Sequence, residues 1–175
     1  MRKQHLLLAG ALALLVCGPA AAQQTARLTD PQIAHIAYTA GQIDIQAAQQ
    51  ALQKSQNPQV REFANDMVRD HTSVNQQALA LCKKLNVTPE DNDTSKSLVK
   101  QADETRAKFA GVSGAAFDKA YAQNEVAYHH TVNTTLENTL IPSTTNPDLK
   151  SLLQTGLKIF QGHEQHAQTL ASGLK

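Results

Sequence analysis

Five acidic or histidine side chains interrupt the apolar patterns of this sequence and are candidates for metal-binding chemistry. Each lies near the middle of a long segment whose other inward positions are apolar at three-and-four spacing. The five are Asp44, His71, Glu125, His129 and His163, and we refer to them together as the polar layer. Burying such groups is costly unless they are paired or bind a metal. Imidazole and carboxylate are ligands of zinc, iron, copper and manganese, and the cores of helical bundles hold such sites.

Four long helices and one shorter helix are predicted to position the polar layer. Three of the long helices begin at an Asp or Asn followed directly by proline, a combination typical of an N-cap and the first helical turn. These pairs are Asp30–Pro31, Asn57–Pro58 and Asn146–Pro147. The apolar spacing predicts long helices over residues 30–54, 57–85, 115–138 and 146–174, and a shorter helix over 98–109. No strand pattern occurs, so the predicted fold class is all-α.

Short connections between long helices favour an antiparallel four-helix bundle, with the shorter helix added before the third long one. If the turn between the first two helices and the turn between the last two lie at the same end, the polar layer falls within about two turns of one level. His71 and His163 then lie near the centres of their apolar faces, and Asp44 lies slightly off-centre. Glu125 and His129 are expected on the flank of theirs.

The polar layer has two interpretations. The first is a mononuclear transition-metal site formed by His71, His163 and either Glu125 or His129, with Asp44 as a further ligand. A di-iron site, and with it an oxidoreductase, is disfavoured because it requires Glu-x-x-His on two helices and the sequence has no such motif. The alternative is a purely structural network of hydrogen bonds that only fixes helix packing.

The beginning of the chain has the pattern of a signal peptide. Met1–Lys3 is basic, Leu6–Val16 is an apolar run, and three alanines ending at Ala22 provide the small residues before a cleavage site. We therefore expect residues 1–22 to be removed by cleavage after Ala22. Residues 23–175 then form one domain in the periplasm or outside the cell, and they contain no run approaching the roughly 20 apolar residues of a membrane span.

A lipid anchor at Cys17 is disfavoured, because Val16 precedes it where lipoprotein signals have a small residue. Cys82 is the one cysteine left after cleavage, and its apolar surroundings predict a buried thiol. Two of the 16 basic residues are Arg2 and Lys3, so 14 basic residues remain against 15 acidic ones. With no Trp and no basic patch, nucleic-acid binding is not expected.

No catalytic motif is present. The sequence lacks a Gly-rich phosphate loop, a zinc-protease helix motif and a nucleophilic serine motif. Asp66 and Asp70 precede His71 on the same predicted helix, on its flank or pointing outward. We expect these carboxylates to be solvated or paired along their own helix, so no catalytic residue is assigned.

Three separated runs carry a resemblance to a known family. Phe63–Thr72 has the pattern Phe-Ala-x-x-Met-Val-x-Asp-His-Thr. Phe117–Tyr121 has the pattern Phe-Asp-x-Ala-Tyr, with His129 following, and His163–Leu170 has the pattern His-x-x-x-Ala-x-x-Leu. In this order the runs resemble the bacterial domain of unknown function 4142 family, over about residues 28–174.

The resemblance implies a ferritin-like helical bundle in an exported protein, and it implies no agreed activity. The chain departs from the family pattern at Asp44, where a glutamate is expected, and in lacking a Leu-Pro pair before His163. We therefore predict an exported ferritin-like bundle with a binding or stress-related role in the bacterial envelope, rather than an enzyme. The identity of the metal, any protein partner and the oligomeric state stay open.

Overall fold

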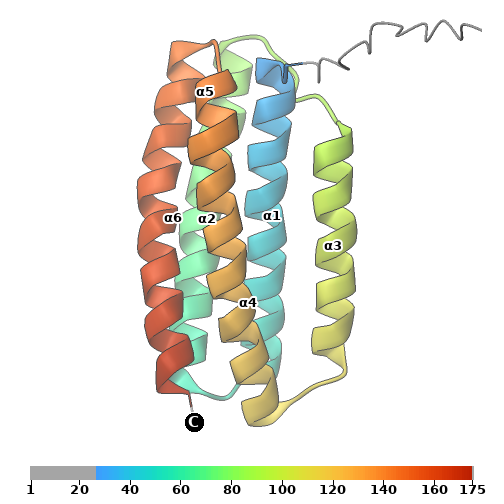
Figure 1. The fold of residues 1–175 in the computed structure, drawn as a ribbon, viewed down its shortest axis with the longest axis vertical. Coiled ribbons are helices and arrows are strands. Elements are labelled where there is room, and N and C mark those ends of the chain that lie inside the picture. Colours follow the sequence, from blue (N-terminus) through green and yellow to red (C-terminus); the bar gives the residue numbers. More distant parts are fainter. Residues whose placement is uncertain (1–26, 175) are drawn as a thin grey trace, which may run out of the picture.

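Helices make up most of residues 27–174, the part of the chain that the computed structural model describes. The main helices are α1 (Asp30–Lys54), α2 (Pro58–Lys84), α3 (Asp93–Ala110), α4 (Gly114–Thr135) and α6 (Pro147–Gly173) (Figure 1). A π-helical turn, η1 (Leu136–Leu140), and the short α5 (Ile141–Ser143) follow α4. These residues contain no strand, and none of their helices is both long and apolar enough to cross a membrane. The predicted signal peptide, its cleavage site and Cys17 lie outside the described residues.

The helices begin where the local sequence supplies caps. Asn57 and Asn146 accept hydrogen bonds from N–H groups in the first turns of α2 and α6, as predicted. The predicted cap of α1, Asp30, is wrong by one residue, because Thr29 forms a capping box with Gln32. The Thr29 hydroxyl accepts from the Gln32 N–H at 3.4 Å, and the Gln32 side chain accepts from the Thr29 N–H at 3.1 Å.

Helix α3 lies on the outside of the bundle, along α1, while α1, α2, α4 and α6 pack side by side (Figure 1). It runs in the same direction as α1. Where both helices begin, the Glu90 N–H donates to the Pro31 carbonyl at 3.0 Å. Where both end, the Lys54 ammonium donates to the Ala110 carbonyl at 2.8 Å. Helix α3 therefore returns the chain to the end that holds the α1–α2 turn before α4 begins.

The connection before α6 lies at the opposite end, beside the start of α1. The N–H groups of Thr145 and Asn146 each donate to the Asp30 carboxylate at 2.8 Å. The expectation that the two turns share one end is therefore wrong, because the 18 residues of α3 are long enough to span the bundle. The polar layer still forms at one level, since each of its members lies near the middle of its helix.

The polar layer separates two apolar clusters. The end that holds the α1–α2 turn, which we call the packed half, is filled by the aromatic residues Phe63, Phe109, Phe117 and Tyr121 together with Met67. Its neighbouring aromatic rings lie 5.8–6.2 Å apart. The other end, which we call the open half, is lined mainly by aliphatic residues: Ile33, Ile36, Leu136, Leu140, Leu149 and Leu153. Cys82 is buried there, as predicted.

Candidate metal centre

Four helices bring the polar layer together inside the bundle. Asp44 comes from α1, His71 from α2 and His163 from α6, and Glu125 and His129 lie one turn apart on α4. All five are buried, and the most exposed, His163, is 7% exposed. The expected flank position of Glu125 and His129 is wrong, because α6 packs along that side of α4 and encloses it.

The ligand atoms of the layer converge on two overlapping groups. His71, His129 and His163 each offer a ring nitrogen within 4.8 Å of the others, and Asp44, Glu125 and His129 do the same with their own atoms. His129 belongs to both groups. The Asp44 Oδ2 atom lies 3.2 Å from His71 Nε2 and 3.3 Å from His129 Nε2. The layer is therefore one cluster rather than a set of separate polar residues.

The close approaches around Asp44 are not aligned as hydrogen bonds. Among the described residues, neither carboxylate oxygen of Asp44 and neither ring nitrogen of His71 has a hydrogen-bond partner. The Nδ1–H of His129 donates to the Glu125 carbonyl at 3.0 Å, which leaves the Nε2 lone pair facing Asp44. Two lone pairs at this distance repel each other unless a proton or a cation lies between them.

Burial shifts the pKa values of the layer in different directions. Burial raises the pKa of Glu125 well above its usual range, and the nearby charge of Asp44 raises it further. Burial alone would also raise the pKa of Asp44, but its interactions with the adjacent imidazoles, chiefly that of His71, hold it below its usual value. Burial lowers the pKa of His129. At neutral pH the layer thus contains an ionised Asp44 beside a neutral Glu125.

Asp70 is a member of the site that the sequence analysis missed. Its Oδ2 accepts a hydrogen bond from His163 Nε2 at 3.0 Å, which leaves His163 Nδ1 buried and without a partner in the described structure. Arg69 holds the same carboxylate from its Nε at 2.7 Å and its Nη2 at 3.0 Å. A carboxylate that fixes the tautomer of a histidine is a common second-sphere feature of metal sites.

The position of Asp70 could not be read from its own helix. Asp70 directly precedes His71 and so points to a different side of α2, where sequence alone gives only a solvated charge. Its partner, His163, is on α6, and only the packing of the two helices brings them together. Burial lowers the pKa of His163 to about 4, although the hydrogen bond to Asp70 opposes this shift.

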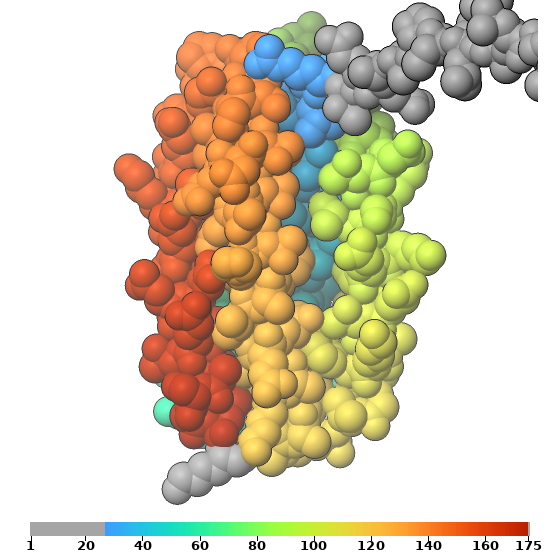
Figure 2. Space-filling view, in the orientation of Figure 1, coloured from blue at the N-terminus to red at the C-terminus, as the bar shows by residue number. Residues whose placement is uncertain are grey.

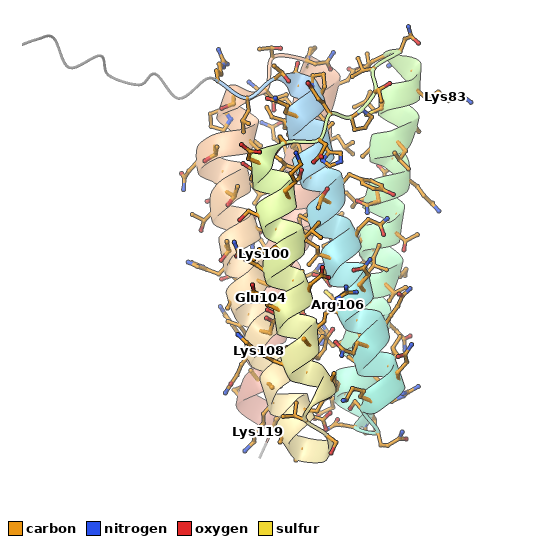
Figure 3. All side chains as sticks on the ribbon, turned by 90° about the vertical axis from the view of Figure 1, so that its right-hand side faces the viewer. Lys83, Lys100, Glu104, Arg106, Lys108 and Lys119 are labelled. Atoms are coloured by element: carbon orange, nitrogen blue, oxygen red, sulfur yellow. The ribbon has the colours of Figure 1, made fainter. Side chains whose placement is uncertain are left out.

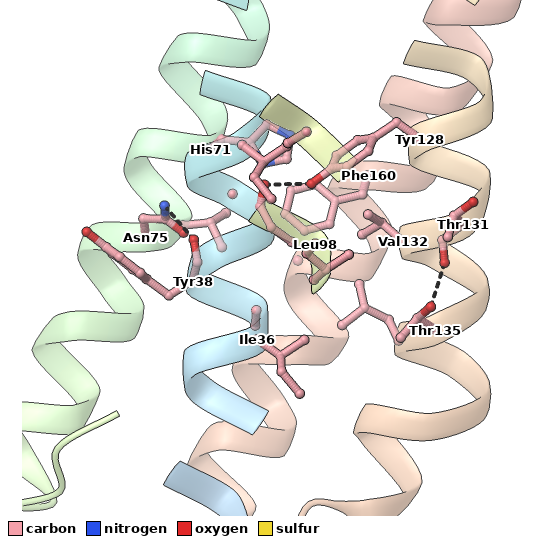
Figure 4. A pocket seen from close by; sticks show the side chains of 18 of the residues that line it. Ile36, Tyr38, His71, Asn75, Leu98, Tyr128, Thr131, Val132, Thr135 and Phe160 are labelled. Atoms are coloured by element: carbon pink, nitrogen blue, oxygen red, sulfur yellow. Dashed lines mark hydrogen bonds between the residues drawn. The ribbon is translucent and has the colours of Figure 1, made fainter. Parts of the chain in front are cut away.

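Aromatic rings enclose the side of the layer that faces the open half. Phe160 stacks on His71 with ring centroids 4.5 Å apart (Figure 4). The Tyr128 hydroxyl donates to the Ala40 carbonyl at 2.7 Å and does not bond to the layer. The buried Tyr121 hydroxyl, on the side of the packed half, has no hydrogen-bond partner within residues 27–174. The imidazoles thus lie in a largely apolar setting, which strengthens electrostatic interactions within the layer.

Comparisons with known proteins place the chain in a family. The copper protein CopM, solved in the Cu(II)-bound form, has a similar fold, with a TM-score of 0.63 and 17% sequence identity over 85% of this chain and 100% of that one. No curated protein matches the sequence. The model of the domain of unknown function 4142 matches residues 16–170, as the sequence motifs predicted. The chain therefore belongs to the domain of unknown function 4142 family.

Proposed function

We propose that this protein is an exported, ferritin-like four-helix bundle that binds one divalent transition-metal ion in the polar layer. The observation that carries the proposal is the convergence of unpartnered, buried ligand atoms from four helices. The expected ligands are Asp44 Oδ2, His71 Nε2, His129 Nε2 and His163 Nδ1. A cation there would neutralise Asp44 and would replace the repulsion between facing lone pairs with coordination bonds.

A single ion fits the layer better than two. Both groups of converging atoms contain His129, whose Nδ1 is already committed to the Glu125 carbonyl. Only its Nε2 is free to coordinate, so the groups share one ligand atom. Glu125, kept neutral by burial, is then a neighbour of the site rather than a charged ligand. Three imidazoles and one carboxylate suit copper or zinc, and the Cu(II)-bound form of CopM makes copper the first ion to test.

The arrangement favours binding over catalysis. Four protein ligands that enclose an ion resemble a closed site, whereas catalytic zinc sites keep one position open for water or substrate. The absence of Glu-x-x-His in the sequence removes the ligand pattern of di-iron oxidases. Together with the predicted signal peptide, these features favour a periplasmic or secreted protein that holds or buffers a transition metal in the bacterial envelope.

Thermal unfolding with added metal tests the proposal. A ligand that binds only the folded state raises the melting temperature, so equimolar copper or zinc should stabilise the chelator-treated protein. His71→Ala and His163→Ala should abolish this response. His130→Ala is the matched control, because His130 is exposed and adjacent to His129 but pairs with Glu164. This control should respond like the original protein.

His71→Leu distinguishes the metal site from a layer that only fixes packing. If the layer binds metal, leucine should destabilise the metal-loaded protein much more than the chelated protein. An equal effect in the two states, together with no metal response in the unmodified protein, would assign the layer to packing alone.

A further inference from the structure

An apolar cavity of about 350 Å³ lies mainly in the open half and extends past the level of the polar layer to Ala47 and Phe109, and the proposed metal site does not account for it. It is bordered by α1, α3 and α4 and reaches inward between α2 and α6. In Figure 4 the side chains of Ile36, Leu98 and Val132 line it, together with His71 and Phe160. A cavity of this volume falls within the range of small-molecule binding sites.

The cavity follows from how α3 is held. Helix α3 packs along α1 but makes few contacts with α4. As a result, α3 and α4 do not close over α1. Figure 2 shows part of α1 at the floor of the cleft between α3 and α4. Small residues line the space from several helices, including Ala37, Ala102 and Ala127. Leaving such a space empty costs stability in proportion to its volume, and an apolar lining does not hold water well.

The cavity is elongated along α1. Its lining along α1 extends from Ala34 to Ala47, which corresponds to about 20 Å at the helical rise. We refer to this elongated cavity as the channel. An extended hydrocarbon chain fits such a space better than a compact ring system does.

One end of the channel carries a positive charge. Arg106, near Phe109 and Ala47, is the one Lys or Arg among the lining residues, and it lies on the side of α3 that faces α1 (Figure 3). Its Nη2 donates to the exposed Asp103 at 2.6 Å. Its Nε is buried and has no hydrogen-bond partner among the described residues. This end of the channel therefore retains a charged donor for an acidic headgroup.

Several other polar groups along the channel are already bonded within the protein, although the ring nitrogens of His71 are not. Asn75 donates to the Tyr38 carbonyl at 3.3 Å, and Tyr128 donates to the Ala40 carbonyl at 2.7 Å (Figure 4). The hydroxyls of the lining threonines Thr105, Thr131 and Thr135 donate to carbonyls of their own helices. The walls thus present mainly hydrocarbon to a ligand, and the unpartnered polar groups among them are His71, at the polar layer, and Arg106.

We propose that this channel binds an amphipathic carboxylic acid with a long apolar tail, the tail lying along α1 and the carboxylate contacting Arg106. The channel borders the metal site, because His71 is part of its lining, but the carboxylate contact at Arg106 involves none of the proposed metal ligands. Burial of the tail supplies the binding energy, and the guanidinium selects an acid over an uncharged molecule of the same length.

Fluorescence titration of metal-free protein with cis-parinaric acid, a fluorescent fatty acid, tests the proposal. The expected result is saturable binding of one molecule per chain, with competition by palmitic acid and at least tenfold weaker competition by cetyl alcohol. Ala102→Leu should weaken binding at least tenfold by filling the channel, whereas Ala110→Leu, at an exposed position of the same helix, should not. Arg106→Gln should weaken binding of the acid but leave that of the alcohol unchanged, and Lys100→Gln is the matched exposed control.

Three results would overturn the proposal: no saturable binding, equal affinity for the acid and the alcohol, or unchanged binding by Ala102→Leu. A channel occupied by a second copy of the chain would also overturn it, and would appear as affinity that falls as the protein concentration rises. The copper or zinc response of Ala102→Leu should equal that of the unmodified protein. Loss of fatty-acid binding with an intact metal response, or the reverse, therefore separates the two proposals.

Discussion

The two halves of the bundle are built differently on either side of the same polar layer. In the packed half, Phe63, Phe117, Tyr121 and Met67 are all 0% exposed and fill the space between the helices. In the open half, aliphatic residues surround a cavity of about 350 Å³, and Phe160 is the one phenylalanine of that cluster. The same helices run through both halves, so the difference lies in side-chain size and in the position of α3.

The two halves therefore have different roles. Close packing of aromatic residues supplies stability, and it holds one side of the polar layer rigidly. The small residues of the open half leave space beside the polar layer, and this space lowers the stability of the fold. Binding sites are commonly supported in this way by a rigid part of the same fold.

The largest expected effect comes from removing a buried side chain of the packed half. Met67→Ala should lower the free energy of unfolding by about 4 kcal/mol, because the surrounding aromatic residues cannot collapse into the space. Leu136→Ala, in the wall of the channel, should cost only about 2 kcal/mol, since that side chain already lacks neighbours on one side. Urea unfolding of metal-free protein measures both values. Equal costs would contradict the distinction between the halves.

The next prediction concerns the polar layer, which should make the stability of the metal-free protein depend on pH. The pKa of His163 is about 4 in the folded protein, below the usual 6.5. Between these values the unfolded chain binds a proton that the folded chain does not, so metal-free protein should lose stability as the pH falls from 6.5 to 4. The contribution of His163 is at most roughly 3 kcal/mol.

His163→Asn isolates this contribution. The lowered pKa of His129 acts in the same direction as that of His163, whereas the raised pKa of Glu125 favours the folded state toward acid pH and opposes both. The difference in unfolding free energy between the protein and the variant, followed by urea unfolding across this pH range, removes the part of these contributions that does not depend on His163. A difference that stays constant with pH would show that His163 is not held neutral by burial.

A smaller effect, on metal affinity, is expected from the partly exposed Asp70 beside the polar layer. Asp70→Asn should weaken metal binding by about 10- to 100-fold, because the amide no longer accepts the His163 proton as strongly or fixes its tautomer. Asp66→Asn is a matched control, since Asp66 pairs with Arg69 on the same helix but does not touch His163. Isothermal titration with zinc measures both. Equal losses in the two variants would indicate a general charge effect instead.

The smallest expected effect is a gain in stability from filling space in the open half. Ala102→Leu should raise the free energy of unfolding by about 1 kcal/mol, because it fills existing apolar space. A leucine at the exposed Ala110 should leave stability within about 0.5 kcal/mol of the original value. Destabilisation by Ala102→Leu in urea unfolding would show that the wall of the channel cannot accept a larger side chain.

Local features of the molecule could be predicted from sequence because their causes are local. The Asn57 and Asn146 caps depend on a few adjacent residues, and the helices follow from apolar spacing. The polar layer was predictable because ionisable groups interrupted otherwise apolar faces at matching heights. The helical fold and the burial of Asp44, His71 and His163 follow from these patterns.

The features that sequence could not provide depend on which helices meet. Asp30 looked like a cap but bonds to the connection before α6, and Asp70 looked like a surface charge but orients His163 from a neighbouring helix. Glu125 and His129 become interior positions because α6 covers their side of α4. The channel depends on the separation of α3 from α4, and the spacing of apolar residues in either helix does not reveal this separation.

Anomalous diffraction from crystals grown with equimolar zinc or copper tests the central claim most directly. We predict one anomalous peak inside the bundle, within coordination distance of Asp44 Oδ2 and of the ring nitrogens of His71, His129 and His163. Data collected on either side of the absorption edge identify the metal. No peak in the layer, with His71 Nε2 in hydrogen-bonding geometry with Asp44 Oδ2, would contradict the claim and leave the polar layer as a packing element.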